Sequence, residues 1–331
     1  MKTVAFFETL LSFRGTTIAI YDYAHYNEKI LGNKSIIVTM AYKKHQALEK
    51  FQARFPTYLV HNWEERDEIL IKENVNVWYE LKYGNPTNIP PPPKGIRVVN
   101  HAVFNMSQPH GDVYAGVSEG LIDFYRTPDK PDVPCVPHMI NVPSVEGDLR
   151  EELMIPSDGI VFGYYGGENS FDIEYVWFVI WYLVFHGCTK HYFVFMNTHR
   201  LTCAHPQIIQ IPGTTDMTRK AKFINTCDAM LHARDQGETF GLAVGEFSSC
   251  NKPVIVNGHN RGTFGHQGDA CGWCDNHLRI LGDKAIKYNS AQELYYILKD
   301  FKPQPEMDWN AYREYTPEKI MAKFDEIFLS D

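Results

Sequence analysis

The sequence lacks the signatures of several classes of protein. Basic residues are not in excess, because 40 acidic side chains outnumber 32 basic ones and give a formal net charge of -8. Nucleic-acid-binding proteins usually carry the opposite balance, so nucleic acid is not an expected partner. No apolar run approaches the roughly 20 residues that span a bilayer, and Glu8 interrupts the short apolar start of the chain. We therefore expect neither a transmembrane segment nor an export signal.

Cysteine is scarce and occurs an odd number of times, with 7 Cys spread over 331 residues. This pattern indicates reduced thiols in the cytoplasm rather than a disulfide framework. Low-complexity sequence is limited to the four prolines at 90–93, which are expected to form an extended spacer. Hydrophobic residues at 44% and charged residues at 22% are ordinary for a globular protein, and the length fits two domains.

Short apolar runs alternate with helical segments along the chain, which predicts parallel sheets covered by helices. The expected strands are 4–7, 35–39, 57–60, 75–79, 96–99 and 113–117, then 159–164, 192–196, 208–211, 229–232 and 253–256. The main expected helices are 16–31, 44–55, 64–73, 171–185, 240–250, 291–299 and 317–328. A proline-rich break at 128–143 separates the two series. The predicted fold is α/β, with two Rossmann-like domains whose parallel sheets face a cleft: residues 1–143, then 144–305, followed by a C-terminal helical segment, 306–331.

Candidate chemistry lies where predicted strands end, because parallel sheets bind ligands beyond the carboxyl ends of their strands. The strand at 229–232 is followed by Glu238 and then by a helix that carries Glu246, with seven residues between the two acids. A glycine at the helix start, Gly241, allows a ligand to approach the backbone, and the helix amides suit phosphate. Two carboxylates placed in this way could bind the hydroxyl groups of a sugar. The alternative is a surface loop and an amphipathic helix with ordinary acids.

Residues 238–255 resemble the signature of retaining GT-B glycosyltransferases of family four. That signature has Glu-x7-Glu with Phe-Gly-Leu inside it, followed by Lys-Pro-Val-Ile, as this sequence does. The resemblance implies that Glu238 meets the hydroxyl groups of the transferred sugar and that Glu246 holds the ribose of the nucleotide. It implies that the backbone of Phe240, Gly241 and Leu242 faces the sugar and the diphosphate. It also implies a C-terminal helix that crosses back to the first domain, and chemistry that needs no metal or other cofactor.

Three further segments match positions that the family uses. Gly15 and Thr16 follow the first strand, where the resemblance implies contact with the donor diphosphate. His101 ends a strand, where the family often carries a histidine near the sugar and the acceptor; a packed core histidine is the alternative. Ile211 ends another strand, where the resemblance implies recognition of the base by backbone groups.

The glycine turn at 163–167 departs from the family pattern. The family follows this turn with an Arg and a Lys that bind phosphates, whereas this sequence has Gly167 and Asp172 at about those places. A diphosphate needs cationic or N–H partners. Gly167 is still expected near the donor, and Arg200, which follows a strand of the second domain, is the preferred replacement cation. The other candidates are Arg14 and the run Arg219-Lys220-Lys222.

Between residues 259 and 277, cysteines and histidines occur at spacings that partly match those of a zinc site. The residues are Cys271, Cys274, His259, His266 and His277. A full signature would need a second regularly spaced pair of ligands, so no metal is predicted, although zinc at Cys271 and Cys274 stays open.

The sequence thus predicts a cytoplasmic enzyme that moves a sugar from a UDP- or GDP-sugar to an acceptor hydroxyl with retention of the anomeric configuration. The acceptor is expected to be a glycan or another hydroxyl compound. Glu238 would position the sugar, and His101 would assist at the reacting end. The alternative is a catalytically degenerate GT-B protein that binds sugar or nucleotide as an interaction module, which the missing Arg and Lys favour. An oxidoreductase is disfavoured because the glycine spacing of its cofactor loop is absent.

Overall fold

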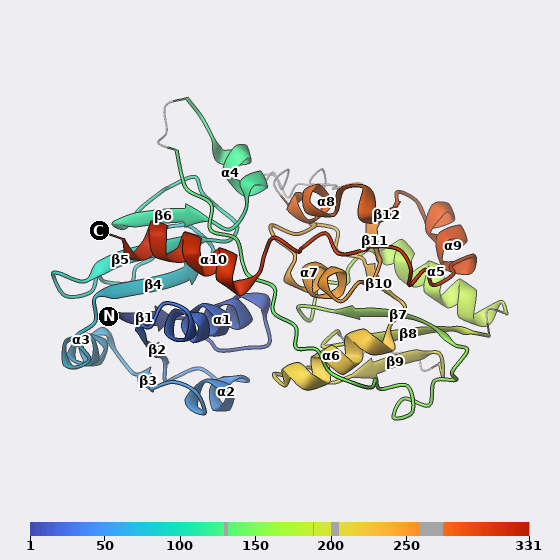
Figure 1. Ribbon diagram of the computed structural model, residues 1–331, viewed down its shortest axis with the longest axis horizontal. Helices are drawn as coiled ribbons and strands as arrows, with labels where there is room; N and C mark the ends of the chain where they lie inside the picture. Colours follow the sequence, from blue (N-terminus) through green and yellow to red (C-terminus); the bar gives the residue numbers. More distant parts are fainter. Residues whose placement is uncertain (129–131, 188, 200–204, 259–273, 331) are drawn as a thin grey trace. The chain divides into compact units, whose positions relative to one another are not determined.

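The computed structural model describes residues 1–128, 132–187, 189–199, 205–258 and 274–330 (Figure 1). The chain divides into two compact units. Unit 1 consists of Met1–Met139 and Tyr315–Asp331, and unit 2 consists of Ile140–Glu314. The described part of each unit contains one six-stranded parallel sheet with helices around it. This confirms the α/β class and the two Rossmann-like sheets that the sequence predicts.

The sheet of unit 1 has the strand order β3-β2-β1-β4-β5-β6. Its strands are β1 (Thr3–Phe7), β2 (Lys34–Met40), β3 (Thr57–Val60), β4 (Val77–Lys82), β5 (Arg97–Ala102) and β6 (Val113–Gly116). Its helices are α1 (Gly15–Lys29), α2 (Leu48–Gln52), α3 (Trp63–Lys72), α4 (Glu119–Tyr125) and α10 (Pro317–Phe324), the last continued by a π-helical turn, η2 (Asp325–Leu329). The central strand β1 is buried along its whole length, as its unbroken apolar run predicts for a sheet covered on both faces.

The core of unit 1 has an aromatic centre beneath its last helix. Phe324 of α10 stacks on Tyr23 of α1 with ring centroids 5.2 Å apart and contacts Tyr79 of β4 at 5.4 Å. Phe328 of η2 contacts Tyr79 at 5.7 Å. Ile320, Phe324 and Phe328 recur every four residues and are all buried, which gives the segment one apolar face. The end of the chain is therefore part of the core of unit 1.

The sheet of unit 2 repeats the same connectivity, with the order β12-β11-β10-β7-β8-β9. Its strands are β7 (Ile160–Tyr165), β8 (His191–Met196), β9 (Ile208–Ile211), β10 (Ala229–His232), β11 (Val254–Asn257) and β12 (Ala285–Tyr288). Its helices are α5 (Glu174–Phe185), α6 (Met217–Thr226), α7 (Leu242–Ser249), α8 (Asn276–Leu281) and α9 (Ala291–Lys299), with a short 3-10 turn, η1 (Gly282–Lys284).

In both sheets the strand order reverses beside the first strand of the unit. The reversal lies between β1 and β4 in unit 1 and between β7 and β10 in unit 2. Doubly wound sheets bind their ligands at this point, beyond the carboxyl ends of the strands. The loops after these four strands are therefore the first places to look for a functional site.

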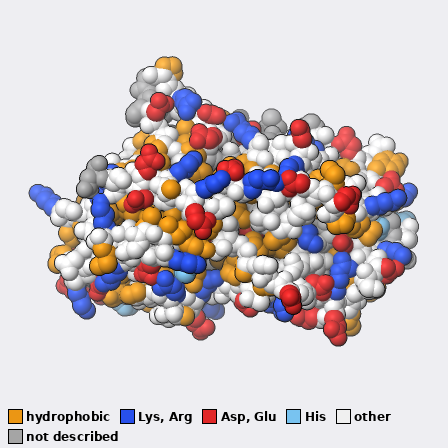
Figure 2. Space-filling model, in the orientation of Figure 1, with side chains coloured by type: hydrophobic (Ala, Val, Ile, Leu, Met, Phe, Trp, Pro, Cys, Tyr) orange, Lys and Arg blue, Asp and Glu red, His pale blue; other side chains and the backbone are white. Residues whose placement is uncertain are grey.

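The surface carries charges of both signs. Figure 2 shows basic and acidic side chains interspersed on one face of the molecule, without a continuous field of either sign. No helix in the described part of the chain is long and apolar enough to cross a membrane. The strongly apolar α5 has 12 residues.

Candidate functional site

The loop between β10 and α7 holds Glu238 at the reversal point of unit 2. Arg234 Nη1 donates to Glu238 Oε2 over 2.8 Å, and His232 Nε2 lies 3.4 Å from Oε1. The backbone N–H of Glu238 donates to the carbonyl of Cys274 over 2.8 Å, which ties the loop to the segment before α8. The Glu238 side chain is 22% exposed, so its carboxylate is held in place and is still partly accessible.

The charge of Arg234 keeps Glu238 ionised despite its burial. Burial raises the pKa of its carboxyl, but the charge of Arg234 and the hydrogen bond with His232 outweigh burial and hold the pKa at about 2. Glu238 in turn raises the pKa of Arg234. His277 packs against His232 with ring centroids 5.1 Å apart, and burial lowers the pKa of His277 to about 3. Glu238 is therefore an acceptor for hydroxyl groups at neutral pH and is unsuited to donating a proton.

The start of α7 presents backbone amides next to this carboxylate. Gly241 is the N-cap residue with a φ of +83°, and a Cβ atom there would lie 3.4 Å from Glu238 Cβ. This left-handed conformation favours glycine, and glycine has no side chain to cap the helix, so the first amides of α7 are available to an anion. A hydrogen bond holds the backbone of Phe240 in place, because its carbonyl accepts from Tyr312 Oη over 3.0 Å. Leu242, half-buried, is the first residue of α7.

The loop after β7 lies next to the Glu238 loop. Asp172 Oδ1 accepts a hydrogen bond from the N–H of Asp235 over 2.7 Å. The hydroxyl of Tyr164 donates to the carbonyl of Ser170 over 2.7 Å, and the Ser170 N–H donates to the carbonyl of Gly167 over 2.9 Å. Gly167 is half-buried in this turn. Residues 166–173 include no Lys or Arg, so this loop brings no cation to the site.

Glu246, which the resemblance implies holds the ribose of the nucleotide, lies inside unit 2. Its Oε1 accepts a hydrogen bond from Lys220 Nζ of α6 over 2.7 Å, and its Oε2 accepts one from the hydroxyl of Tyr165. Glu246 is 4% exposed and Lys220 is 8% exposed, and Lys220 Nζ lies 5.0 Å from the Tyr165 ring centroid. Both oxygens of the carboxylate are thus engaged inside unit 2. Lys220, one of the candidate phosphate-binding cations, is committed to the same buried pair.

His101, which is expected at the reacting end, lies in the core of unit 1. It is completely buried in unit 1, with Nδ1 2.7 Å from Tyr79 Oη and its ring 5.1 Å from that of Phe328. Burial and the neighbouring His138 lower the pKa of His101 well below its usual value. The physical reason is the alternation of β5, which turns His101 toward the aromatic centre. The geometry is that of a neutral core histidine.

Gly15 and Thr16 begin α1 at the reversal point of unit 1, beside Glu8 at the end of β1. Thr16 Oγ1 donates to Glu8 Oε1 over 3.2 Å. Burial raises the pKa of Glu8 to about 7, and its Oε2 is buried without a hydrogen-bond partner in the described part of the chain. The sequence identifies Glu8 only as the break in an apolar run and does not predict its place beside the start of α1. Its position directly after β1 was the available signal.

The remaining predicted residues are dispersed. Ile211 closes β9, and its carbonyl accepts a hydrogen bond from the N–H of Asn197 over 3.3 Å. Arg219 pairs with Glu152 over 2.6 Å at the surface. Outside the described residues lie Arg200, Cys271, His259 and His266. Among the residues that are described, no three His, Cys, Asp or Glu side chains are grouped so as to hold a metal ion.

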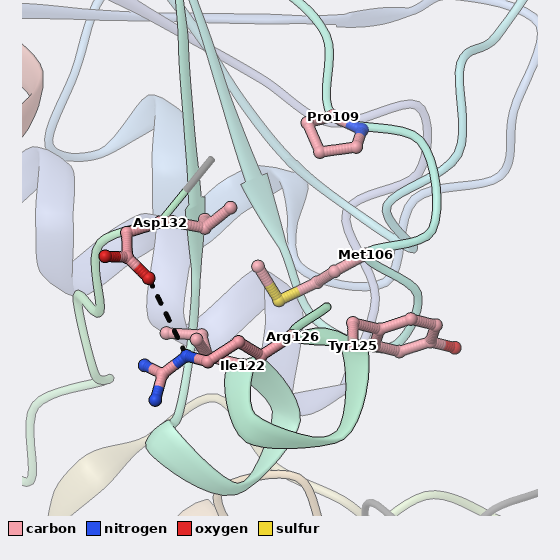
Figure 3. A pocket seen from close by; sticks show the side chains of 7 residues that line it. Met106, Pro109, Ile122, Tyr125, Arg126 and Asp132 are labelled. Atoms are coloured by element: carbon pink, nitrogen blue, oxygen red, sulfur yellow. Dashed lines mark ion pairs between the residues drawn. The ribbon is translucent and has the colours of Figure 1, made fainter. Parts of the chain in front are cut away.

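Unit 1 also has a pocket between α4 and the loop that follows β5 (Figure 3). Its lining is mostly apolar and consists of Met106, Pro109, Ile122, Tyr125, Arg126, Asp132 and Val133. Arg126 Nε lies 3.7 Å from Asp132 Oδ1, so the charge of the arginine is balanced within the pocket. None of the site residues predicted from the sequence lines it, and we assign it no function.

No protein-family model and no curated protein sequence matches this chain. Solved structures match it over its full length. Anabaena HepE in complex with UDP has a TM-score of 0.68 and 11% identity, with 98% of this chain and 99% of that chain covered. WaaG, a glycosyltransferase involved in lipopolysaccharide biosynthesis, has a TM-score of 0.63 and 11% identity, with 99% and 100% covered. A glycosyltransferase from Rickettsia africae has a TM-score of 0.62 and 13% identity, with 100% and 99% covered.

The chain therefore has the GT-B fold. This confirms the fold that the resemblance in residues 238–255 implies. At identities of 9–13%, the likeness defines the fold, and the activity has to be argued from the residues of this chain.

Proposed function

We propose that this chain is a glycosyltransferase that moves a sugar from a nucleoside-diphosphate sugar to an acceptor hydroxyl. The observation that carries the proposal is Glu238, an ionised and partly accessible carboxylate beside the free amides of α7. A carboxylate accepts hydrogen bonds from sugar hydroxyls, and helix amides bind phosphate. The fold supports the same function, because HepE, which it resembles, has been solved with UDP-glucose.

We further propose a UDP- or GDP-linked donor, no metal or other cofactor, and retention of configuration. Glu238 would hold the sugar, while the backbone of Phe240, Gly241 and Leu242 and the Gly167 turn would face the diphosphate. Arg234 donates to one oxygen of Glu238, which makes this carboxylate a poor covalent nucleophile. A mechanism without a covalent intermediate is therefore favoured, in which the acceptor attacks on the face that the diphosphate leaves. Gly15, Thr16 and Arg200 remain predicted diphosphate contacts, Ile211 a predicted base contact, and the cytoplasm the predicted location.

A degenerate GT-B protein that binds nucleotide or sugar without transfer is the second candidate. Two observations favour it. Glu246 is only 4% exposed, and both of its oxygens already accept hydrogen bonds within unit 2, which limits the access of a ribose to it. The turn after β7 also lacks cations, and leaving-group charge needs fixed positive partners.

Thermal unfolding in the presence of UDP-, GDP-, ADP- and dTDP-sugars tests donor binding. A ligand at 100 times its dissociation constant should stabilise the protein by about 2.7 kcal/mol. We expect a clear shift with one donor and a smaller shift with its nucleoside diphosphate alone. Glu238→Gln should make the shift with the donor equal to the shift with its nucleoside diphosphate, because the sugar loses its ionised acceptor. Glu306→Gln, at an exposed acid, is the matched control and should keep the difference between the two shifts.

Transfer itself is tested by following the anomeric proton signals of the product by NMR. Product with the configuration of the donor supports the retaining transferase. A donor shift without transfer or donor hydrolysis supports the degenerate protein. No shift with any donor contradicts both candidates.

A further inference from the structure

Helix α5 is apolar on two opposite sides. The side that faces the sheet is buried and consists of Val176, Val179, Ile180, Leu183 and Val184. On the other side Phe178 is 67% exposed, Tyr182 is 43% exposed and Phe185 is 60% exposed, and Trp181 between them is half-buried. A helix that is apolar all round is normally enclosed by other protein. Within the residues that the structure describes, the outer side of α5 therefore lacks a cover that its composition calls for.

Helix α9 extends this exposed side. It packs beside α5 in unit 2 (Figure 1), where Tyr295 contacts Tyr182 with ring centroids 5.6 Å apart and Tyr296 is 51% exposed. Within α5, Trp181 and Phe185 stack at 5.5 Å, so the rings are already ordered against one another. We refer to Phe178, Trp181, Tyr182, Phe185 and Tyr296 as the aromatic patch.

The size of the aromatic patch fits the centre of a protein interface. An enclosed aromatic side chain buries roughly 150–250 Å², so the exposed fractions of Phe178, Tyr182, Phe185 and Tyr296 correspond to about 450 Å² of accessible surface. A stable interface takes about 800 Å² from each partner, of which more than half is apolar. One copy of the patch thus supplies most of the apolar area that a dimer of this chain would need.

The charges around the patch disfavour a membrane as its cover. Helices that lie on membranes carry Lys and Arg on their polar side and bind anionic lipid. α5 has one charged residue, Glu174, and neither Lys nor Arg. In α9, Glu293 and Lys299 offset one another, and the whole chain has a net charge of -8. An uncharged aromatic surface is complementary to another copy of itself, as an interface with two-fold symmetry requires.

We propose that the aromatic patch is the centre of a two-fold interface between two copies of this chain. When α5 packs antiparallel on α5 of a second copy, the two-fold axis passes between Trp181 and Tyr182. Phe178 of each copy then meets Phe185 of the other, and these rings can pair edge to face. The inference goes beyond the proposed function, because it involves no residue of the donor site.

Sedimentation equilibrium of the full-length chain, from nanomolar to tens of micromolar, tests the interface. The unmodified chain should be a dimer at the upper concentrations. The double variant Phe178→Glu with Phe185→Glu should dissociate at least about 100-fold more readily, because two central anchors become buried charges. Ile71→Glu is the control: Ile71 is 64% exposed on α3 of unit 1, and its substitution should leave the dimer unchanged.

Cross-linking tests the antiparallel arrangement. Phe178→Cys with Phe185→Cys should form a covalent dimer on mild oxidation, whereas Phe178→Cys alone should not, because the two copies of position 178 lie on opposite sides of the axis. A monomer at every concentration, or a dimer that survives the double Glu variant, overturns the proposal. A monomer that binds vesicles of phosphatidylcholine and phosphatidylglycerol through the aromatic patch also overturns it.

Discussion

Arg66 fastens the proline segment at 90–93 to the core of unit 1. Arg66 Nη1 donates to the carbonyl of Pro90 over 2.7 Å, and Nη2 donates to that of Pro91 over 3.1 Å. Its guanidinium carbon lies 4.9 Å from the Trp63 ring centroid and 5.4 Å from that of Trp78. The sequence predicts only an extended spacer here, because a hydrogen bond from an arginine more than 20 residues earlier leaves no local pattern.

Arg66→Lys should lower the free energy of unfolding by about 3 kcal/mol, since an ammonium cannot form the planar fork or stack between the two indoles. Urea unfolding measures the effect. Arg313→Lys, at a half-exposed surface ion pair, is the matched control and should cost less than about 1 kcal/mol. Equal losses in the two variants would show that the guanidinium geometry of Arg66 does not matter.

The role of Glu246 can be tested at the level of one residue. If its pair with Lys220 is a core ion pair, Lys220→Met should cost about 3–5 kcal/mol, because it leaves a buried carboxylate unpaired. Lys220→Met combined with Glu246→Leu should recover much of that loss. Urea unfolding of the two single variants and the double variant forms the test. A stable Glu246→Gln variant that loses only the nucleotide-dependent thermal shift would restore Glu246 as a ribose ligand.

Site residues differ in how far the sequence can predict them. Glu238 is predictable because its spacing to Phe240, Gly241 and Leu242 is local. Arg234, which holds Glu238, has no such pattern, since a loop residue four positions away has no fixed direction. The strand position of His101 could be predicted, but the side of β5 on which it lies could not, because both faces of this sheet are covered.

At the scale of elements, the segment α10–η2 packs on buried His101 through Phe328, and the ring of a second buried histidine, His138, lies 6.0 Å from that of His101. His138 Nδ1 lies 3.2 Å from Tyr23 Oη, and burial lowers the pKa of His138 to about 3. The ordinary pKa of histidine is about 6.5 in the unfolded chain. The unfolded chain therefore takes up the proton first as the pH falls. The contribution of neutral His138 to the free energy of unfolding is therefore complete above about pH 6.5, and it is lost progressively as the pH falls toward 3.

The variant His138→Gln should weaken the pH dependence of unfolding. Between about pH 6 and pH 4, the slope of the unfolding free energy should fall by about 1.4 kcal/mol per pH unit, the share of one buried neutral histidine. Urea titrations at several pH values measure the slope. His61→Gln, at an exposed histidine, should leave the slope unchanged. A slope unaffected by His138→Gln would mean that His138 is not kept neutral by the fold.

Elements were predictable in proportion to how apolar and continuous they are. β2 and β9 stand where the sequence places them within about a residue, because buried parallel strands form unbroken apolar runs. Helix α8 and strand β12 are among the elements that were not predicted. Each is short, with 6 and 4 residues, and β12 mixes Lys with apolar residues, so neither has a clear period.

At the scale of the whole molecule, alternation of strands and helices was enough to predict two parallel sheets. The order of the strands within each sheet could not be predicted in the same way. β1 pairs with β2, the next strand along the chain, and also with β4, which follows only after β2 and β3. Pairing over such distances is decided by the packing of complete layers. The reversal points that locate the candidate site therefore emerge only from the assembled fold.

The place of α10 and η2 has a consequence for how the protein is made. Unit 2 occupies one continuous stretch, Ile140–Glu314, whereas unit 1 joins the first and last parts of the chain. A chain leaving the ribosome can complete unit 2 while Tyr23 and Tyr79 still lack the rings of Phe324 and Phe328 that cover them. The strands of unit 1 are thus synthesised before unit 2, but their core closes after it. A chain cut before Phe324 leaves that core open, because Tyr23 and Tyr79 then lack the rings that pack on them.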